Sequence, residues 1–488
     1  MAGRLEEDPS DQFRRIVLGH ELSEIGEAAI KPLLYVNAAH VKMLQKQKLI
    51  PSGTAGKILS VLKQIDNQGI SVLNIDQAED IYLALEQKLI KVLGMKEAGN
   101  IHMGRSRNDI YSTVYRMILR QKLIGVYEHL LELRQKVADL AESQKATIMP
   151  GYTHTQHAQP ITVGYYFLGV FDLLGRDMQR LRNAWALINN SPLGAAALTT
   201  TSFELDRNYT CEILGFDAIV YNAYDAISGR DYVNDAVLAL YNTVSDISRV
   251  VTDLMTWNMF EFSFIEIPDE FAGISSIMPQ KKNPSAFEFL RSAASWVLGD
   301  TIGVISSPKG VSYSDIRDGT KYLYSPLWHA VEVTSNVVKL FSEVLPGIKW
   351  DSERMLEETN EGYSTMTDLA DHMVQKYKIT FREAHNLVAA FVKVSIVQKK
   401  KANELSIDDF NNVCFDQGFS FKMNQEELGD VLDPQKCLNR RNVEGGTSER
   451  QLKYMLSECA EQLNSEKLWY EEKRKRLERV EQKIFALE

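Results

Sequence analysis

The amino-acid sequence predicts an all-α protein, elongated and divided into three helical domains, with a long helical bundle at its centre. Three observations support this class. Apolar residues recur at alternating spacings of four and three over several long segments, as they do on one face of a helix. Alternation of apolar and polar residues, which is typical of strands, is rare and short. The chain of 488 residues is 44% hydrophobic, which allows a large core shared among several domains.

The first elements are helical. A helical domain is expected over residues 1–110, because the helical pattern breaks near Gly104–Asp109. A stripe at heptad spacing then predicts the first long helix, and its residues are Val126, Leu130, Leu133, Val137 and Leu140. A second stripe predicts a helix from about Asp231 to Asn258, roughly 40 Å long at 1.5 Å per residue. Its residues are Val233, Val237, Leu240, Val244, Ile247, Val251 and Leu254.

The later elements complete the predicted bundle. A helix is expected after Pro284, because proline is favoured in the first helical turn, and another over residues 327–345. Polar, turn-rich sequence near residues 359–365 ends the bundle, so we expect a central domain over 111–361 and a C-terminal helical domain over 362–488. The apolar edges of such long helices favour assembly with other copies of the chain.

The charge balance excludes one class of partner. The chain carries 55 Lys and Arg against 65 Asp and Glu, a formal net charge of −10. This balance argues against a general nucleic-acid binder, which would show a concentrated basic surface. The basic run at residues 473–476 is interleaved with glutamates, and we interpret it as a solvated helix face.

The spacing of the cysteines and the lack of a recognisable targeting signal indicate a cytoplasmic protein. The four cysteines lie far apart and form no Cys-x-x-Cys or Cys/His cluster, so reduced thiols and no metal site are expected. The first residues lack the apolar core of a signal peptide, and no apolar run reaches membrane-spanning length. We therefore expect a cytoplasmic location and no membrane partner.

The segment with the most chemical content is residues 275–284, which read Ser-Ser-Ile-Met-Pro-Gln-Lys-Lys-Asn-Pro. It places hydroxyls, a cation and an amide in a loop just ahead of a helix. Such groups can accept a proton and stabilise a developing anion, as an elimination beside a carboxylate requires. Taken alone, a segment of this composition is more commonly a mobile surface loop.

Residues 104–109, Gly-Arg-Ser-Arg-Asn-Asp, form a second polar segment. Arg107 can bind a carboxylate in a forked geometry, and Ser106 and Asn108 add hydrogen-bonding groups beside it. The alternative is an Asn or Asp cap that starts the long helix beyond.

A third polar segment, residues 150–160, contains His154 and His157. Two histidines three apart suggest a metal site, but no acidic or thiol residue is spaced to complete one. Proton transfer by His154 beside a carboxylate-binding Thr153 is the better functional interpretation. The alternative for either histidine alone is a loop residue that satisfies its own hydrogen bonds.

These three segments together resemble the argininosuccinate lyase family, a branch of the fumarase/aspartase superfamily. The family's signature loop, G-S-S-x-M-P-x-K-x-N, is matched by residues 274–283, except that Ile274 stands where the family has Gly. Further matches extend over nearly the whole chain and are weakest before about Pro51. They are Gly104–Asp109, Gly151–Pro160, Pro192–Leu198, Arg230–Tyr232, Thr367–Asp371, Phe381–His385 and Gly445–Thr447.

The resemblance implies an elimination that splits a C–N or C–O bond beta to a carboxylate and usually releases fumarate. By this resemblance Ser275 would be the base, His154 would help move the proton towards the leaving group, and Glu288 would orient His154. Lys281 and Asn283 would stabilise the carboxylate of the carbanion, since serine is a weak base unless its anion is stabilised. The other residues expected to bind substrate are Ser106, Arg107, Asn108, Thr153 and Gln159. The resemblance also implies no metal or organic cofactor, and a homotetramer in which three subunits build each site around a small aminodicarboxylate.

The chain departs from the family where the family holds the nitrogen side of its substrate. The family's Y-N-K-D-x-Q-E-D-K corresponds to residues 313–321, of which Tyr313 and Lys321 match at the ends. Asp315 stands where the family has Lys, and Asp318 where it has Gln. In the family's H-x-Q-R, the last position is His157 here.

These departures leave three functions open. The first is a C–N lyase that releases fumarate and an amine from an N-substituted aspartate other than argininosuccinate, because a reversed charge cannot keep the same partners. The second is a divergent argininosuccinate lyase of arginine synthesis. The third is a catalytically silent structural protein, as among crystallin relatives. Fumarate release from argininosuccinate or from other aspartate adducts would distinguish them.

Overall fold

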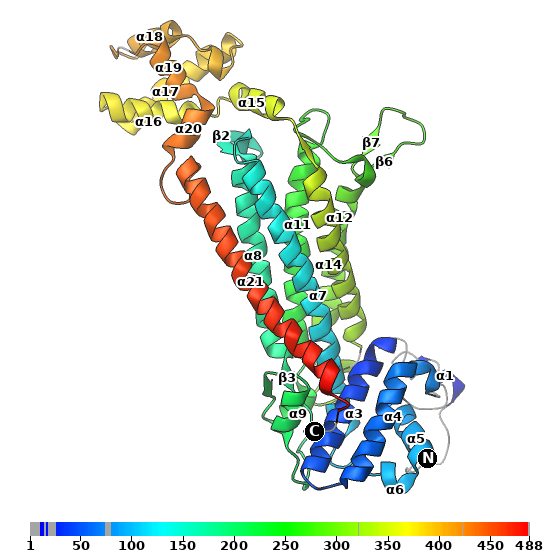
Figure 1. Ribbon diagram of the computed structural model, residues 1–488. Coiled ribbons are helices and arrows are strands. Elements are labelled where there is room, and N and C mark those ends of the chain that lie inside the picture. The colour runs from blue at the N-terminus through cyan, green and yellow to red at the C-terminus, as the bar shows by residue number, and fades with distance from the viewer. Residues whose placement is uncertain are drawn as a thin grey trace.

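The computed structural model describes residues 10–13, 16–17, 26–73, 80–320, 322–421 and 423–486. The architecture is all-α and elongated, which confirms the predicted class (Figure 1). A group of N-terminal helices lies at one end of a long bundle, called the lower end here as in Figure 1. Its helices are α1 (Asp11–Phe13), α3 (Ile30–Lys46), α4 (Ser52–Gln68), α5 (Ile81–Leu93) and α6 (Met95–Ala98). Short 3₁₀ turns cover Gly26–Ala29 and Ile70–Val72.

The bundle consists of long helices that pack side by side (Figure 1). They are α7 (Arg107–Ser143), α8 (Val163–Ile188), α11 (Asp231–Trp257), α12 (Ser285–Ser306) and α14 (Tyr324–Val344). Each predicted long helix is present, and α11 ends one residue before the expected Asn258. Both predicted apolar stripes are buried along their whole length, so the heptad pattern identified the inward faces correctly.

A second group of helices lies at the upper end (Figure 1). It contains α15 (Ser352–Glu361), α16 (Met366–Tyr377), α17 (Phe381–Val397), α18 (Ile407–Asp416), α19 (Gln425–Leu432) and α20 (Pro434–Arg440). The last helix, α21 (Glu449–Lys483), then runs back down the bundle against α7 and α8. The expected third domain therefore contains both a separate group, with its own core, and a helix that shares the core of the bundle. The domain boundaries themselves stay predictions.

Short elements connect these helices. The longest strands form an antiparallel hairpin at the upper end, β1 (Ile148–Thr153) with β2 (Gln156–Thr162). Two-residue pairs join β3 (Asn190–Ser191) to β4 (Ala218–Ile219), β5 (Ile265–Glu266) to β8 (Lys349–Trp350), and β6 (Gly273–Ile274) to β7 (Lys282–Asn283). The short helices α9 (Arg207–Ile213), α10 (Ala223–Ser228) and α13 (Arg317–Thr320) lie in the connections at the lower end. Among the described helices, none is long and apolar enough to cross a membrane.

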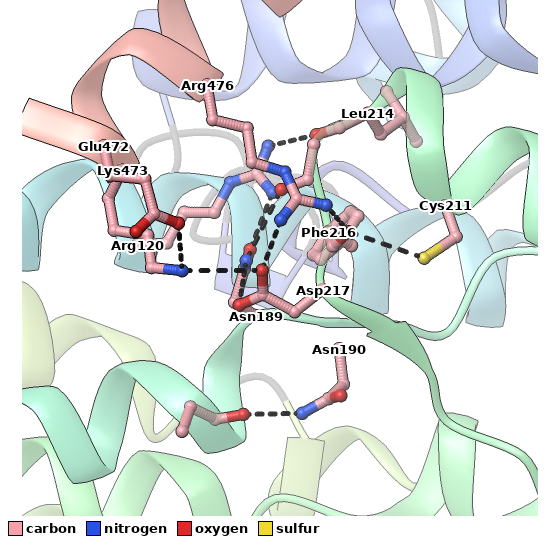
Figure 2. Close-up of polar contacts among 12 residues, drawn as sticks. Arg120, Asn189, Asn190, Cys211, Leu214, Phe216, Asp217, Glu472, Lys473 and Arg476 are labelled. Atoms are coloured by element: carbon pink, nitrogen blue, oxygen red, sulfur yellow. Dashed lines mark hydrogen bonds and ion pairs between the residues drawn. The ribbon is translucent and has the colours of Figure 1, made fainter. Parts of the chain in front are cut away.

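Near its C-terminal end, α21 is anchored to the lower end of the bundle by a network of charged groups (Figure 2). Arg476 pairs with Asp217, and Lys473 Nζ lies 3.7 Å from the same carboxylate. Asp217 accepts a hydrogen bond from Asn189 Nδ2 at 2.8 Å, and Asn189 Oδ1 accepts from the buried Arg120 at 2.9 Å. Burial and the nearby Arg476 lower the pKa of Arg120 to about 9.

This network corrects the interpretation of residues 473–476 as a solvated helix face. Arg474 and Lys475 are more exposed and pair with glutamates of their own helix, and Arg474 also lies 3.5 Å from Glu128 of α7. Lys473 and Arg476 are three apart, so they share the other face and turn inward to Asp217. The sequence pattern could not separate the two faces, because the partner of the inward pair lies more than 250 positions earlier.

A buried carboxylate lies between α8 and α11. Asp177 is fully buried and pairs with Arg180 Nη1 at 2.6 Å, while Asp246 lies 4.0 Å from the same nitrogen. Burial and the neighbouring Asp246 raise the pKa of Asp177 to about 7, although Arg180 opposes the shift. A group whose folded pKa lies above its unfolded value stabilises the fold while it is protonated.

We predict that Asp177→Asn flattens the pH dependence of stability. The unfolded pKa of Asp is about 4, so the stability contributed by the protonated form is present below that pH and is lost as pH rises through about 7. The variant should therefore gain in melting temperature relative to wild type at about pH 8 and lose that gain at about pH 5. Melting curves of both proteins at the two pH values measure this, and an equal difference at both would contradict it.

Candidate active site

The loop that contains Ser275 lies at the upper end of the bundle and is closed by the β6–β7 pair (Figure 1). Gly273 pairs with Asn283, and a Cβ at Gly273 would come within 2.4 Å of Ser285 Oγ, so a larger residue here would have to displace that hydroxyl. Ile274, which replaces the family's Gly, points its side chain outward with 93% exposure. The substitution therefore fits because the side chain meets solvent and not the loop.

Ser275 is held by the backbone of its own loop. Its Oγ accepts hydrogen bonds from the N–H groups of Ile277 at 3.3 Å and Met278 at 3.0 Å. Two N–H donors stabilise an oxygen anion more than a neutral hydroxyl, so they favour loss of the serine proton. The hydroxyl is half-buried in this chain, and the residues that follow it are exposed.

The two lysines of the loop have different surroundings. Lys282 Nζ pairs with Glu266 at 2.8 Å and with Asp269 at 2.5 Å, so its charge is already balanced by two carboxylates at the surface. Lys281 is exposed, and among the described residues no ion pair engages its side chain. Both border a groove of about 830 Å³ between the loop and the start of α15. Lys281 is thus the lysine left to meet an anion.

His154 stands at the tip of the β1–β2 hairpin. His154 and Thr155 have φ values of 51° and 61°, as both central residues of a type I′ turn do. Thr153 and Gln156 close the turn, and their side chains, like that of His154, are exposed. Gln159, further along β2, is exposed as well.

Sequence reasoning missed this hairpin and placed only a polar loop here. The turn lacks the Asn-Gly or Asp-Gly pair that usually marks a two-residue hairpin. Pro150 and Pro160 also argue against strands, yet the two prolines face each other in the ladder. The hydrophobic residues Ile148 and Ile161 were the only weak indication of strands that this sequence offered.

Residues 104–109 form the N-terminal cap of α7 at the lower end. Ser106 is the N-cap in a capping box with Asp109, so the structural alternative for this segment is correct in part. Arg107 pairs with Asp80 at 2.8 Å, and Asn108 Nδ2 donates to Ala197 O at 3.2 Å. These two side chains lie at the surface, partly engaged within the chain.

Asp109 ties this cap to residues 192–198, another segment that resembles the family. It is fully buried and accepts from the N–H groups of Gly194 at 2.9 Å and Ala196 at 3.0 Å. Burial raises its pKa to about 6 in spite of these hydrogen bonds. The sequence did not identify Asp109 as the residue that holds the two segments together.

The divergent stretch that begins at Tyr313 also lies at the lower end. Tyr313 donates to Asp225, and Asp315 lies 3.7 Å from Arg230 Nη2, which also donates to Ser112 at 3.0 Å. Asp318 is exposed, and the expected substrate residue Lys321 lies outside the described residues. The charge reversal at Asp315 therefore faces a buried arginine of the same chain.

A single chain brings together only part of the predicted site. The hairpin and the Ser275 loop share the upper end, whereas residues 104–109 and 313–318 share the lower end (Figure 1). α7 alone has 37 residues and so separates the ends by roughly 55 Å. Within the described structure no hydrogen bond or ion pair joins His154 to Glu288, which lies exposed in the first turn of α12. In the same described part, no group of His, Cys, Asp and Glu could hold a metal ion.

The elongated all-α bundle with its signature loop defines a lyase of the fumarase/aspartase superfamily. A family model described as lyase matches residues 15–299, and one described as argininosuccinate lyase C-terminal matches residues 363–439. The chain belongs to the argininosuccinate lyase family.

Several known proteins support this assignment. The argininosuccinate lyase of Methanocaldococcus jannaschii is 35% identical over 92% of both chains. Argininosuccinate lyase 1 of Shouchella clausii is 34% identical over 96% of this chain and 94% of its own. An EDDS lyase variant with bound fumarate has 30% identity and a TM-score of 0.87, covering 98% of this chain and 95% of its own. The class II fumarase of Schistosoma mansoni shares the fold, with 17% identity, a TM-score of 0.70, and coverage of 88% and 96%.

Proposed function

We propose that the protein is a C–N lyase that removes an amine from an N-substituted aspartate by β-elimination and releases fumarate. The observation that carries the proposal is the setting of Ser275. Its hydroxyl accepts hydrogen bonds from two backbone N–H groups, and in the described structure the nearby Lys281 forms no ion pair. A family in which relatives are named argininosuccinate lyase, and a similar structure that binds fumarate, agree with this reaction.

In the proposed reaction, the Ser275 alkoxide takes a proton from the carbon next to a substrate carboxylate. The electron pair of that C–H bond passes into the carboxylate and forms a dianionic aci-carboxylate. Lys281 and Asn283 stabilise this charge. The electrons then return as the C–N bond breaks, and a proton delivered with the help of His154 leaves with the amine. The dicarboxylate that remains is fumarate.

We propose that each active site is assembled from several copies of the chain. Ser275 and Arg107 lie at opposite ends of a long bundle, so one chain cannot place both on one small substrate. Several apolar side chains of α12 are exposed, as they would be where other copies cover them. These residues are Phe289, Trp296, Leu298, Ile302 and Ile305. A homotetramer of antiparallel copies would bring lower and upper ends together.

Two substrates remain in competition. The identity of about 34% to argininosuccinate lyases favours argininosuccinate. The pairing of Asp315 with Arg230 favours another aspartate adduct, because the family has a lysine at this position. Fumarate absorbance with purified protein, argininosuccinate, aspartate and a panel of N-substituted aspartates distinguishes them. Turnover of none of these would overturn the proposed reaction.

We predict that Asp315→Lys changes substrate preference and also destabilises the protein. The new cation would lie beside Arg230, whose guanidinium is buried, and like charges in a poorly solvated site repel. Asp315→Asn is the matched control, since it removes the charge without adding one. The measurements are the kcat/KM ratios across the panel of substrates and the melting temperatures. An unchanged substrate preference in both variants would show that Asp315 does not determine specificity.

A further inference from the structure

The hairpin that carries His154 rests directly on the joint between α15 and α16. His157, the cross-strand partner of Tyr152, presses its ring against Gly362. A Cβ added at Gly362 would lie 1.7 Å from His157 Nδ1, 2.5 Å from Cγ and 2.8 Å from Cβ. Because the clash reaches the root of the side chain, a rotamer change alone would not relieve it. The strand itself would have to move.

The rest of the His157 ring is held from the hairpin side. Nε2 lies 3.2 Å from the Tyr152 hydroxyl, and the two rings meet edge to face at 5.0 Å between centroids. Nδ1 is shielded from solvent and finds no hydrogen-bond partner in the described part of the chain. The ring is therefore held between a hydrogen bond on one side and a close contact with Gly362 on the other.

The joint between α15 and α16, residues 362–365, has an unfavourable local structure. Tyr363 has a φ of 54°, in the left-handed region that residues with a bulky side chain rarely adopt. Among the described residues, the buried atoms Asn360 Oδ1, Ser364 Oγ and Thr365 Oγ1 have no hydrogen-bond partner. Such groups persist only where surrounding structure holds them, so the joint is set by packing and not by its local preferences.

We propose that His157 is a positioning residue: through its contact with Gly362 the α15–α16 joint sets the position of the hairpin tip that carries Thr153 and His154. The inference rests on the proposed function, which gives those two residues their roles. His157 itself touches no reacting atom. It stands where the resemblance gives the family an Arg, so the His157–Gly362 contact involves one of the positions at which this chain departs from the family's motif.

The test is a double-mutant cycle. Gly362 has φ −80° and ψ 6°, which alanine adopts without strain, so Gly362→Ala acts only through the added methyl. Gly362→Ala should lower kcat by about tenfold to a hundredfold, the scale of a displacement near 1 Å. In a His157→Ala background the contacts with the ring atoms Nδ1 and Cγ are gone and only the contact with Cβ at 2.8 Å is left, so adding Gly362→Ala should have a much smaller effect than in the wild type. His157→Gln, which can still bond Tyr152, should retain more activity than His157→Ala.

A second readout makes the test independent of turnover. Amide hydrogen exchange in the peptide spanning residues 148–162 should be faster in Gly362→Ala, and the increase should be much smaller when Gly362→Ala is added to His157→Ala. Gly429→Ala is the matched control, because it lies in α19 with open space around its added Cβ and should leave both readouts unchanged.

A failure of the proposed function can be distinguished from a failure of the inference about His157. A wild-type protein without lyase activity overturns the proposed function, and the exchange measurement then decides the inference alone. An active wild type with unchanged kcat and exchange in Gly362→Ala overturns the inference and leaves the function intact. Equal losses from Gly362→Ala in both backgrounds would also overturn it, since the effect would not pass through His157.

Discussion

Ser275→Ala is expected to lower kcat by about two orders of magnitude or more, the scale of a positioned general base. The variant removes the oxygen that accepts the N–H groups of Ile277 and Met278 and leaves the loop closed by its β6–β7 pair. Because those donors stabilise the serine anion, KM should change much less than kcat. Steady-state rates of fumarate release, with single-turnover rates beside them, measure the effect.

Ser306→Ala is the control for this substitution. Ser306 lies exposed at the far end of α12 and donates only to Gly303 O, so its loss should leave kcat within error. A loss of less than about tenfold in Ser275→Ala would remove Ser275 from the role of base. The reaction would then need another proton acceptor at the same loop.

Mixing two inactive variants is expected to restore activity. Ser275→Ala removes the proposed base at the upper end, and Arg107→Met removes a proposed carboxylate ligand at the lower end. Each variant alone should lose about a hundredfold in kcat/KM, because each spoils every site of its own assembly. If a site draws these residues from different copies, about a quarter of the sites in random mixed tetramers would contain both native residues.

The measurement is fumarate release after the two variants are dissociated together and reassembled, with native mass spectrometry to count mixed assemblies. Two differently tagged copies of Ser275→Ala, mixed in the same way, form the control and should stay inactive. Mixed tetramers without recovered activity would show that Ser275 and Arg107 serve no common site. Recovery would also establish that the functional unit contains more than one chain.

The long helices could be predicted from the sequence because their signal is local and repeated. In α11 the apolar positions from Val233 to Leu254 recur over several turns, and each buries against the bundle. The signature loop was equally readable, since its serines, lysine and asparagine lie within ten positions of one another. Neither required knowledge of any distant residue.

The hairpin at His154 and the partners of charged residues could not be predicted in this way. The positive φ values of His154 and Thr155 are imposed by strand pairing, because the turn has none of the usual glycine or asparagine signals. Asp315 appeared only as a reversed charge until the fold placed Arg230 beside it. Likewise, the fold alone sorted Arg476 inward to Asp217 and Arg474 outward.

By itself, the sequence determined that the protein is an all-α lyase and which loop carries the candidate base, because helical periodicity and a short motif are encoded by neighbouring residues. Only the tertiary structure decided that the candidate base lies at the opposite end of the bundle from the candidate ligands Ser106, Arg107 and Asn108. It also decided that the hairpin of His154 rests on the joint at Gly362. The physical reason is that both results depend on the length of the helices and on the packing of segments far apart in the sequence. A pattern of neighbouring residues contains no information on either arrangement.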